Sequence, residues 1–290
     1  MTMPSDVGVI DLMMGIPEGH KKDWYQFLRA GFMDEESGDM EFPVQYMFKG
    51  VPDDIEEGAD PVAAVLGEMD HFGIERAMLG VHFERNESLR ALQQHPDRFF
   101  GSYEVNPNRG MKGIRELVRA HEELGIRSAT AFPAGMTPQV PINDKRFYPF
   151  YAKCIELDIP ICITTGVPGP RVPMLCQKTE LLDEVCWYFP ELKIVMRHGA
   201  EPWDALAVKL MLKWPNLYYS TSAFAPKYYP QTIIDYANTR GADKIMYAGY
   251  FPMGLSLERI FSELPHVGLK DDVWPKFLRE NAVRVFGLEG

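Results

Sequence analysis

Short apolar runs and longer amphipathic segments alternate along most of the chain. Each apolar run is bounded by Gly, Pro or Asn, as expected of a strand buried in a parallel sheet. Eight such runs predict strands at 7–13, 76–83, 99–106, 128–134, 160–166, 193–199, 217–223 and 245–251. Apolar positions at helical spacing predict helices at 60–72, 87–95, 112–124, 147–157, 179–188, 203–213, 231–239 and 257–263, with a final helix at 271–286.

This alternation predicts an α/β protein. Eight strands that are each followed by a helix are typical of a (β/α)8 TIM barrel, in which one parallel sheet closes into a cylinder. The alternative is an open, doubly wound sheet. A dinucleotide-binding sheet of that kind carries G-x-G-x-x-G directly after its first strand, whereas the first strand here continues as VIDLMMGIPEG. The sequence therefore favours the barrel, formed as a single domain over residues 1–290.

The segment 15–59 interrupts the alternation after the first strand. Its roughly forty-five residues exceed the usual length of a connection. It is rich in aromatic and methionine side chains, namely Trp24, Tyr25, Phe27, Phe32, Phe42, Tyr46, Met47 and Phe48. In a barrel this segment emerges at the C-terminal face, where active sites form. We predict a long insertion that acts either as a lid and apolar wall of the site or as a dimer contact, and the sequence leaves both open.

Charge and composition exclude several classes of partner. The chain has 30 Lys and Arg against 41 Asp and Glu, a net charge of −11. Nucleic acid binding is disfavoured, because phosphates require a basic surface. No uninterrupted apolar run reaches the ~18 residues that span a membrane, and no apolar signal segment follows Met1. The four cysteines form no C-x-x-C pair, so we expect reduced thiols in a cytoplasmic protein that binds a small-molecule substrate.

The ends of the predicted strands carry the candidate chemistry, because the active site of a barrel enzyme forms where its strands end. Polar and sulfur-containing side chains at these ends are Asp11, Met13, His82, Glu104, Asn106, Thr130, Thr164, Thr165, Arg197, His198, Ser220, Thr221 and Tyr250. The chain has only seven histidines, and two of them belong to this set. That scarcity limits the metal sites that histidine could form.

Several motifs resemble a known family. They are RHGAEPW at the sixth strand, WPNLYYSTS at the seventh and ENAVRVFGL near residue 288. Together with FFGSYEVNP and ELGIRSATAFP, they are similar to the amidohydrolase-2 branch of the amidohydrolase superfamily over nearly the whole chain outside 15–59. The resemblance implies a TIM barrel, a mononuclear divalent metal and commonly a homodimer. It also implies hydrolysis, non-oxidative decarboxylation or hydration of small carboxylated compounds, which are often aromatic or cyclic.

The ligand positions that the resemblance implies hold other residues. The family motif I-D-x-H-x-H is expected at the end of the first strand, and this chain reads IDLMMG, which places Met13 and Gly15 there. The fifth-strand ligand, normally His, is Thr164, and the eighth-strand acid, normally Asp, is Tyr250. Thioethers and neutral hydroxyls are poor ligands for zinc, manganese and magnesium. Since only His198 is retained, we predict that the inherited metal site is lost and that the protein uses no cofactor.

His198 is the predicted acid–base residue. A histidine at a strand end titrates near neutrality, and the adjacent charge of Arg197 disfavours the imidazolium form. Arg197 would bind a substrate carboxylate bidentately, and Tyr250 would donate a hydrogen bond or a proton. Each has a structural alternative. These are a histidine kept from a metal-binding ancestor, an ion pair in the helix layer, and an aromatic ring filling the vacated cavity.

Glu104 is a second candidate acid or base, with a salt bridge at the rim as its alternative. Other predicted substrate contacts are Met13, Trp24, His82, Thr164, Thr165 and Thr221. For His82, on an otherwise apolar strand, a role in the core is favoured. Asp11 shares strand parity with Met13, and we expect a buried, hydrogen-bonded carboxylate there rather than a catalytic group.

These residues support one principal hypothesis and two alternatives. The principal one is a metal-independent amidohydrolase-like enzyme, a lyase, decarboxylase or hydrolase, that acts on a small carboxylated, cyclic or aromatic compound through His198. Decarboxylation is favoured, because protonating a carbanion needs an acid but no activated water. The alternatives are a non-catalytic binding or regulatory protein, and a metal-dependent hydrolase whose site has moved to His198, His82, Glu104 or Asp11. A connected polar cavity around His198 would favour the enzyme.

Overall fold

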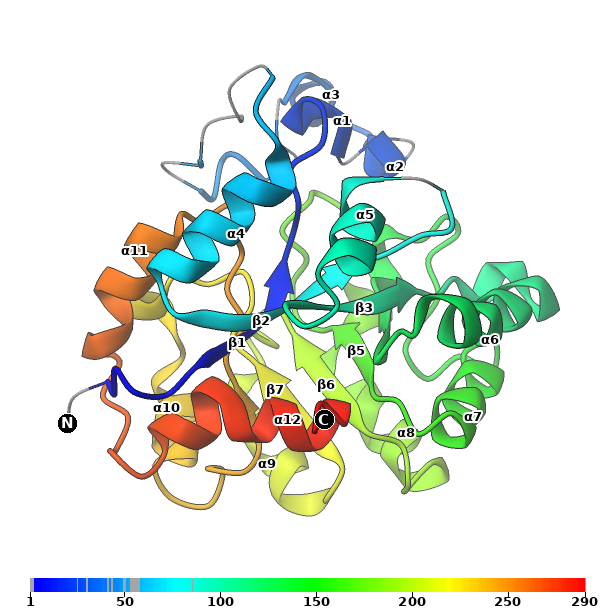
Figure 1. Ribbon diagram of the computed structural model, residues 1–290. Helices are drawn as coiled ribbons and strands as arrows, with labels where there is room; N and C mark the ends of the chain where they lie inside the picture. The colour runs from blue at the N-terminus through cyan, green and yellow to red at the C-terminus, as the bar shows by residue number, and fades with distance from the viewer. Residues whose placement is uncertain are drawn as a thin grey trace.

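The structure is a computed structural model that describes residues 3–24, 26–29, 31–40, 42, 44–48, 51–52, 58–84 and 86–289, with the backbone only at 21 and 22. Tyr25 of the predicted aromatic segment lies outside these residues. Parallel strands follow one another in chain order within one sheet. They are β1 (Val9–Met14), β2 (Ile74–Gly80), β3 (Phe99–Glu104), β4 (Ser128–Ala131), β5 (Ile161–Thr164), β6 (Ile194–Arg197), β7 (Leu217–Ser220) and β8 (Ile245–Met246). The predicted (β/α)8 barrel is confirmed (Figure 1).

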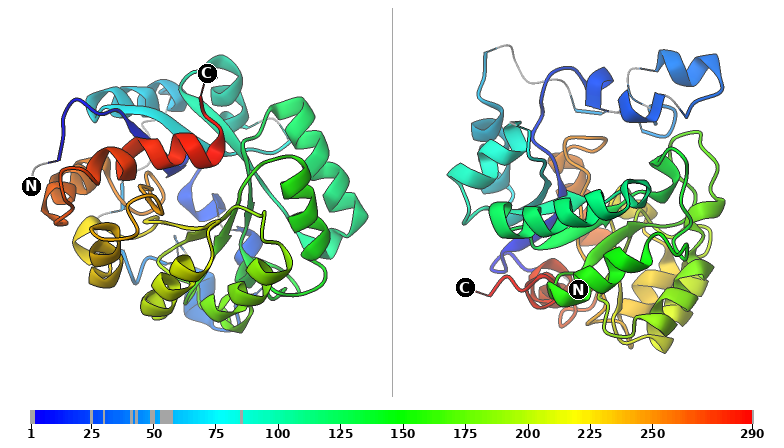
Figure 2. Two further views of the ribbon diagram at one scale, coloured as in Figure 1. Left: turned by 90° about the horizontal axis from the view of Figure 1, so that it is seen from below. Right: turned by 90° about the vertical axis from the view of Figure 1, so that its right-hand side faces the viewer.

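Helices cover the outside of the barrel (Figures 1 and 2). They are α4 (Pro61–His71), α5 (Glu87–Gln94), α6 (Met111–Leu124), α7 (Tyr148–Glu156), α8 (Leu182–Tyr188), α9 (Asp204–Lys213), α10 (Gln231–Ala237), α11 (Leu257–Glu263) and α12 (Asn281–Phe286). The 3-10 turns between elements are η1 (Pro107–Arg109), η2 (Pro133–Gly135), η3 (Leu175–Gln177), η4 (Thr179–Leu181), η5 (Pro226–Tyr228) and η6 (Leu264–His266). None of the described helices is both long and apolar enough to cross a membrane.

Local chemistry explains where the helices begin and end. Asp60 caps α4, because its Oδ1 accepts a hydrogen bond from the N–H of Val62 at 3.0 Å, and Pro61 fits the first helical position. Gly125 ends α6 in the left-handed conformation, with φ at 60°. The helix predicted at 271–286 contains a π-helical turn, η7 (Lys276–Glu280). There the carbonyl of Phe277 accepts a hydrogen bond from the N–H of Tyr247, just after β8, at 2.9 Å.

The barrel has two apolar layers. The larger cluster lies between the sheet and the surrounding helices and includes Ile74, Phe99, Leu117, Ile161 and Ile233. A second cluster fills the inside of the barrel with Ile10, Leu12, Met78, Phe100, Cys162, Val195 and Met246. Side chains of α12 belong to this inner cluster, so α12 covers the inner core at the end of the barrel remote from α1 to α3 (Figure 1).

Asp11 closes the seam between the first and last strands. Its Oδ1 accepts hydrogen bonds from the N–H of Met13 at 2.9 Å and of Gly249 at 2.8 Å. Beyond it, the N–H of Gly15 donates to the carbonyl of Phe251 at 3.0 Å. Only a glycine fits at position 249, because a Cβ there would lie 2.6 Å from Asp11 Oδ2. As predicted, Asp11 is a fully buried, hydrogen-bonded carboxylate.

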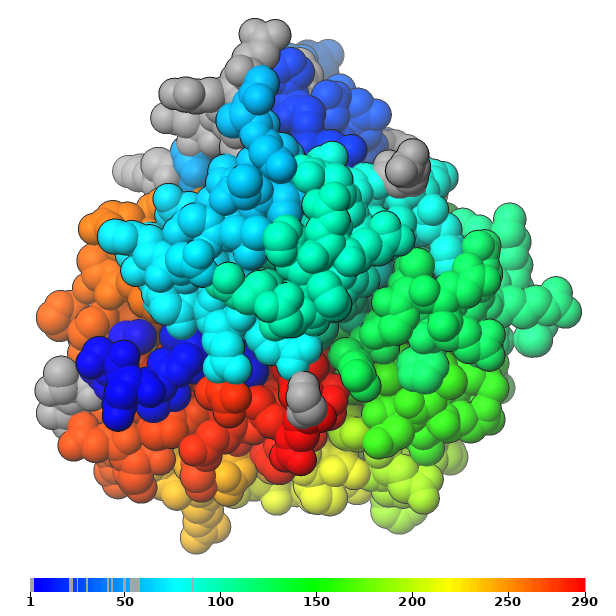
Figure 3. Space-filling model, viewed as in Figure 1, coloured from blue at the N-terminus to red at the C-terminus, as the bar shows by residue number. Residues whose placement is uncertain are grey.

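The described residues of the segment 15–59 include three short helices, at the end of the barrel where the strands finish (Figure 1). The helices are α1 (Lys21–Trp24), α2 (Gln26–Arg29) and α3 (Glu35–Asp39). The coloured atoms of this segment project at the same end of the molecule in Figure 3. Arg171, in the loop after β5, pairs with Asp34 at 3.0 Å and Glu36 at 2.8 Å. The hydroxyl of Tyr46 donates to the carbonyl of Gly169 in the same loop. These contacts tie the segment to the barrel, and its role as a lid or dimer contact stays a prediction.

Asp11 makes folding stability depend on pH. Burial raises its pKa from 3.8 to about 6, despite the two N–H donors that lower it. The folded chain therefore holds more protons than the unfolded chain between those values, and stability falls as the pH rises from 4 to 6. Asp11→Asn keeps a neutral oxygen acceptor, so we expect the variant to gain up to about 3 kcal/mol relative to the wild type between pH 4 and 7.5.

Urea unfolding of both proteins at the two pH values measures this gain. Asp272→Asn, at an exposed aspartate, is the matched control and should gain none. A variant whose stability relative to the wild type is the same at both pH values would contradict the assignment.

Candidate functional site

A cavity of about 510 Å³ opens where the strands end. Its floor is formed by side chains at or just after β1, β3, β5, β6 and β8, and its walls by the segment 15–59 and by loops after β4, β5, β7 and β8. The charged and polar groups on the floor include Glu104, Arg197, His198 and Tyr250. The chain therefore has a connected cavity around His198, the feature expected of an enzyme rather than of a filled scaffold.

Arg197 places a buried positive charge on the cavity floor. It ends β6 directly beside Thr164 of β5, and its side chain is 9% exposed. One Nη atom contacts the thioether sulfur of Met13, and Nε is buried without a hydrogen-bond partner among the described residues. Burial lowers the pKa of the guanidinium. No described carboxylate lies within ion-pair distance, and the more distant charge of Glu104 offsets only part of the cost of burying this cation.

His198 follows Arg197 in an unusual backbone conformation. Its φ is +61°, a left-handed value that is strained for a non-glycine residue. Its N–H donates to Ser222 Oγ at 3.1 Å, and the same hydroxyl lies 3.2 Å from its Nδ1. Because Ser222 already accepts one bond, we assign its proton to Nδ1, which leaves the imidazole protonated on Nε2. Burial, and next the charge of Arg197, lower the pKa of His198 to about 3, so the ring is neutral at pH 7.

Tyr250 links the histidine to the wall. Its ring packs edge-on against His198, with centroids 5.7 Å apart, and stacks on Phe48 at 5.5 Å. It is 8% exposed. The ring of Tyr250 therefore lies in contact with both His198 and Phe48, and it connects the histidine to the segment 15–59.

Glu104 is the acidic group of the floor. It ends β3, and its side chain is accessible from the cavity while protein surrounds it. Removal from bulk water raises the pKa of its carboxyl, and the charges of His82 and Arg197 lower it by less. A carboxyl of this kind holds a proton to higher pH than an exposed glutamate and suits proton transfer.

The structure brings together six of the predicted site residues and leaves four outside the cavity. The cavity is lined by Met13, Glu104, Thr164, Arg197, His198 and Tyr250. Thr165 and Thr221 are buried, and their hydroxyls donate to the carbonyls of Arg197 and Ala248. His82 is exposed and contacts the ring of Tyr103. Trp24 donates to the carbonyl of Glu18. The lining that the structure describes includes none of these four.

Several lining residues were not predicted from the sequence. Phe132, Phe224, Tyr228 and Leu255 come from loops after β4, β7 and β8, and Ser222, which bonds His198, follows β7. The available signal was position alone, because loops after barrel strands surround the site. Nothing in the local residue pattern distinguishes these side chains from ordinary loop residues.

The described residues offer few metal ligands. Among the lining side chains, Glu104, His198 and Glu201 carry groups that commonly bind metal ions. No group of three or more His, Cys, Asp and Glu side chains within the described part of the chain is arranged to hold an ion. These residues alone therefore do not make a complete set of protein ligands.

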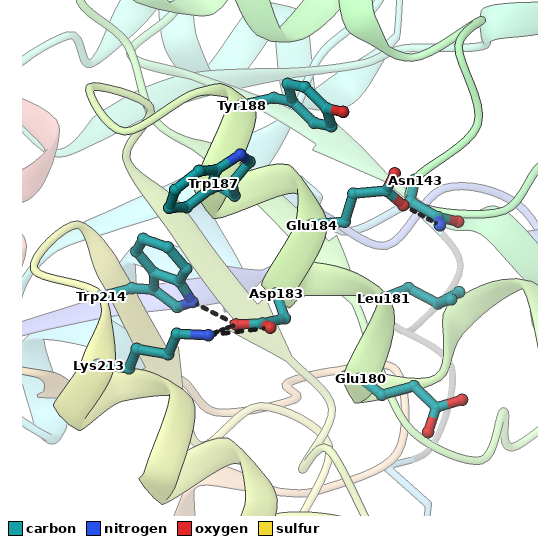
Figure 4. A pocket seen from close by; sticks show the side chains of 9 residues that line it. All are labelled: Asn143, Glu180, Leu181, Asp183, Glu184, Trp187, Tyr188, Lys213 and Trp214. Carbon is teal, nitrogen blue, oxygen red and sulfur yellow. Dashed lines mark hydrogen bonds and ion pairs between the residues drawn. The ribbon is translucent and has the colours of Figure 1, made fainter.

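A second, shallow depression lies outside the barrel, between α8 and α9 (Figure 4). Asp183 in it accepts hydrogen bonds from Trp214 Nε1 and Lys213 Nζ, both at 2.7 Å. Its principal charged groups are thus already paired with one another. The depression offers no isolated charge comparable with that of Arg197.

Comparison with known proteins identifies relatives over the whole fold. The model of a family described as Amidohydrolase matches residues 31–288. No curated protein matches the chain. Among solved structures, an uncharacterized TIM-barrel protein from Bordetella bronchiseptica is 23% identical with a TM-score of 0.76, over 97% of this chain and 99% of that one.

Two decarboxylases share the same fold. The 2,6-dihydroxybenzoate decarboxylase from Rhizobium is 18% identical with a TM-score of 0.65, over 98% of this chain and 100% of that one. The 5-carboxyvanillate decarboxylase from Novosphingobium aromaticivorans is 17% identical with a TM-score of 0.67, over 97% of both chains. It was crystallised with bound manganese and a nitrobenzoic acid.

The bound manganese corrects the cofactor prediction. The residue types at Met13, Thr164 and Tyr250 predicted that the protein uses no cofactor. That prediction is wrong, because a metal cofactor accompanies this fold in its structural neighbours. Residue types at inherited positions exclude one ligand set, but they do not exclude a metal held by other groups.

Removing the buried charge of Arg197 should raise the folding stability of the protein but weaken its binding of a carboxylate ligand. Arg197→Met replaces an unpaired cation by an apolar side chain of similar length. Replacing even a buried ion pair by apolar residues is neutral or stabilising by 1 to about 4 kcal/mol, and a charge without an ion-pair partner is costlier to bury. Without ligand, we expect Arg197→Met to have a melting temperature several degrees above that of the wild type, because 1 kcal/mol of stability corresponds to about 2–4 °C. We also expect it to bind benzoate at least tenfold more weakly.

Differential scanning calorimetry and isothermal titration measure the two effects. Arg119→Met, at an exposed arginine on α6, is the control and should leave benzoate binding unchanged. A variant that still binds benzoate as the wild type does would show that Arg197 is not the carboxylate contact.

Proposed function

Because this chain belongs to the amidohydrolase family, we propose that it is an enzyme that removes the carboxylate from a small carboxylated aromatic compound. The observation that carries this proposal is the unpaired guanidinium of Arg197 on the floor of a cavity with aromatic walls. The fold is shared with two decarboxylases of aromatic acids. A planar acid places its carboxylate against Arg197 and its ring among Phe48, Phe132 and Tyr250.

Arg197 supplies the counter-charge that the substrate carboxylate needs in a site removed from water. The guanidinium fork matches a carboxylate bidentately. Binding thereby neutralises the buried charge. The ligand is thus selected by charge first and by the flat aromatic wall second.

Glu104 is the proton donor. Its raised pKa keeps a larger fraction of the carboxyl protonated near neutral pH than an exposed glutamate would have. It transfers this proton to the ring carbon that carries the carboxylate, and the bond between that carbon and the carboxylate then breaks to release CO2. Because Glu104 is accessible from the cavity, solvent returns the proton.

His198 and Tyr250 stabilise charge rather than transfer the proton. With a pKa of about 3, the imidazole is a weak base at pH 7 and donates a hydrogen bond from Nε2. The phenol of Tyr250 is a second donor beside it. Both would support the negative charge that develops on the oxygen of a hydroxylated ring when CO2 leaves and the electrons of the broken bond return to the ring. No step is assigned to a metal ion, since the described residues form no group of three donors.

Loss of Glu104 should abolish turnover without abolishing binding. The assay is CO2 release from a panel of hydroxylated benzoates, with manganese added to every reaction. We expect Glu104→Gln to lower kcat by about 10²- to 10⁴-fold, the usual contribution of a general acid, while KM changes little.

Glu123→Gln, at an exposed glutamate on the outer face of α6, is the control and should retain full kcat. Circular dichroism checks that both variants fold. If the wild type turns over a panel member and Glu104→Gln does so at the same rate, Glu104 is not the donor. If the wild type releases CO2 from no member, the proposed reaction is wrong.

The pH profile distinguishes the two candidate acids. Turnover that needs protonated Glu104 falls as the pH rises through the raised pKa of that carboxyl. His198 stays neutral above about pH 5, because its pKa is about 3, and should add no limb near pH 6.5. We therefore expect kcat to decrease with a single limb whose midpoint lies above 4.5, the ordinary pKa of a glutamate carboxyl. A kcat that rises through pH 6 to 7 would instead implicate the imidazole as a base.

A further inference from the structure

The cavity has a polar floor and an apolar upper half. The floor groups lie at the strand ends, whereas the upper walls come from 15–59 and from the loops after β5 and β7. Four apolar wall residues remain largely exposed: Phe27 at 53%, Met47 at 57%, Val167 at 53% and Tyr228 at 60%. Exposed apolar side chains that gather around one opening mark a surface that binds an apolar partner.

These wall residues are held in place by contacts between their loops. Val44 packs on Gly169 so closely that a Cβ on that glycine would lie 2.7 Å from Val44 Cγ1. The guanidinium of Arg171 lies 5.1 Å from the ring centroid of Tyr46 and also pairs with Asp34 and Glu36. The loop that carries Val167 and the segment that carries Met47 therefore form one continuous wall. Such preorganised surface binds ligand at a lower entropic cost than separate mobile loops.

The size of the cavity exceeds what one carboxylated ring requires. Cavities of about 300–1,000 Å³ accommodate drug-sized ligands, and this one is about 510 Å³. A ring whose carboxylate contacts Arg197 occupies the floor and leaves the apolar upper half without an occupant. Charge alone does not account for that half, because its exposed residues are apolar.

We propose that the substrate carries an apolar substituent of several carbon atoms, remote from its carboxylate, which fills the upper half of the cavity between Met47, Val167 and Tyr228. This inference rests on the proposed function for the position of the carboxylate. The substituent makes the substrate amphiphilic, and the three wall residues determine its specificity. Each methylene buried there strengthens binding about fourfold, the factor that corresponds to about 0.8 kcal/mol.

A series of 4-alkylbenzoates, from methyl to hexyl, tests the proposal through equilibrium binding. Isothermal titration with the wild type and added manganese should show Kd falling about fourfold per methylene and levelling off once the chain reaches bulk solvent. Met47→Ala and Tyr228→Ala should reduce the total gain along the series at least tenfold. Trp187→Ala removes an exposed aromatic ring from the separate depression in Figure 4 and should leave the gain unchanged.

The outcomes separate this inference from the proposed function. If all members bind with the same Kd, the apolar half takes no substituent and the inference is wrong, although the carboxylate contact stands. If no member binds, the carboxylate contact at Arg197 fails and the proposed function fails with it.

Light scattering after size exclusion examines the competing occupant, a second copy of the chain. If Met47→Ala and Tyr228→Ala turn a dimer into a monomer and the alkyl series shows no gain, the exposed wall is an interface between copies and the inference is overturned. An unchanged oligomeric state together with a reduced gain supports the substituent site.

Discussion

A buried cation with no ion-pair partner among the described residues is the constraint on which the rest of the site depends. Arg197 lies at the end of β6 with its Nε unpaired, against the sulfur of Met13 rather than a carboxylate. The same charge helps to keep His198 neutral and opposes the rise in the pKa of Glu104. The fold tolerates this arrangement because the strands around it are fixed by the barrel. An anionic ligand would relieve the cost of the buried charge, and this is the physical basis of the proposed selectivity for acids.

The barrel and part of its floor could be predicted because both follow from short-range patterns. Buried strands read as apolar runs, and the strand-end rule then places Glu104, Thr164, Arg197 and Tyr250 at one end. Adjacent residues of a strand normally face opposite ways, which would separate Arg197 from His198. They line the same cavity because φ of His198 is +61°, a backbone conformation that no sequence pattern predicts. Thr165 and Thr221 bond to backbone carbonyls instead, as strand-end hydroxyls often do.

The contacts that build the upper walls, and the cofactor, lay beyond sequence reasoning for a different physical reason. Phe48 stacks on Tyr250 across about two hundred residues of chain, and Tyr46 reaches Gly169 in another loop. Such contacts depend on how loops pack, and composition only showed that 15–59 is aromatic. The cofactor prediction failed because it treated a set of inherited positions as the whole of the metal chemistry. A structural neighbour with bound manganese corrects it.

The inner core also bears on how the chain acquires its fold. Ile10 and Leu12 of β1 share the inside of the barrel with Val285, Phe286 and Leu288. Asp11 likewise takes its second N–H donor from Gly249. During synthesis, β1 leaves the ribosome long before either partner exists, at about 5–20 residues per second. The first strand therefore lacks its packing partners in the inner core and its hydrogen-bond partner Gly249 for many seconds. During that time, chaperones or transient contacts within the nascent chain must cover its apolar side chains.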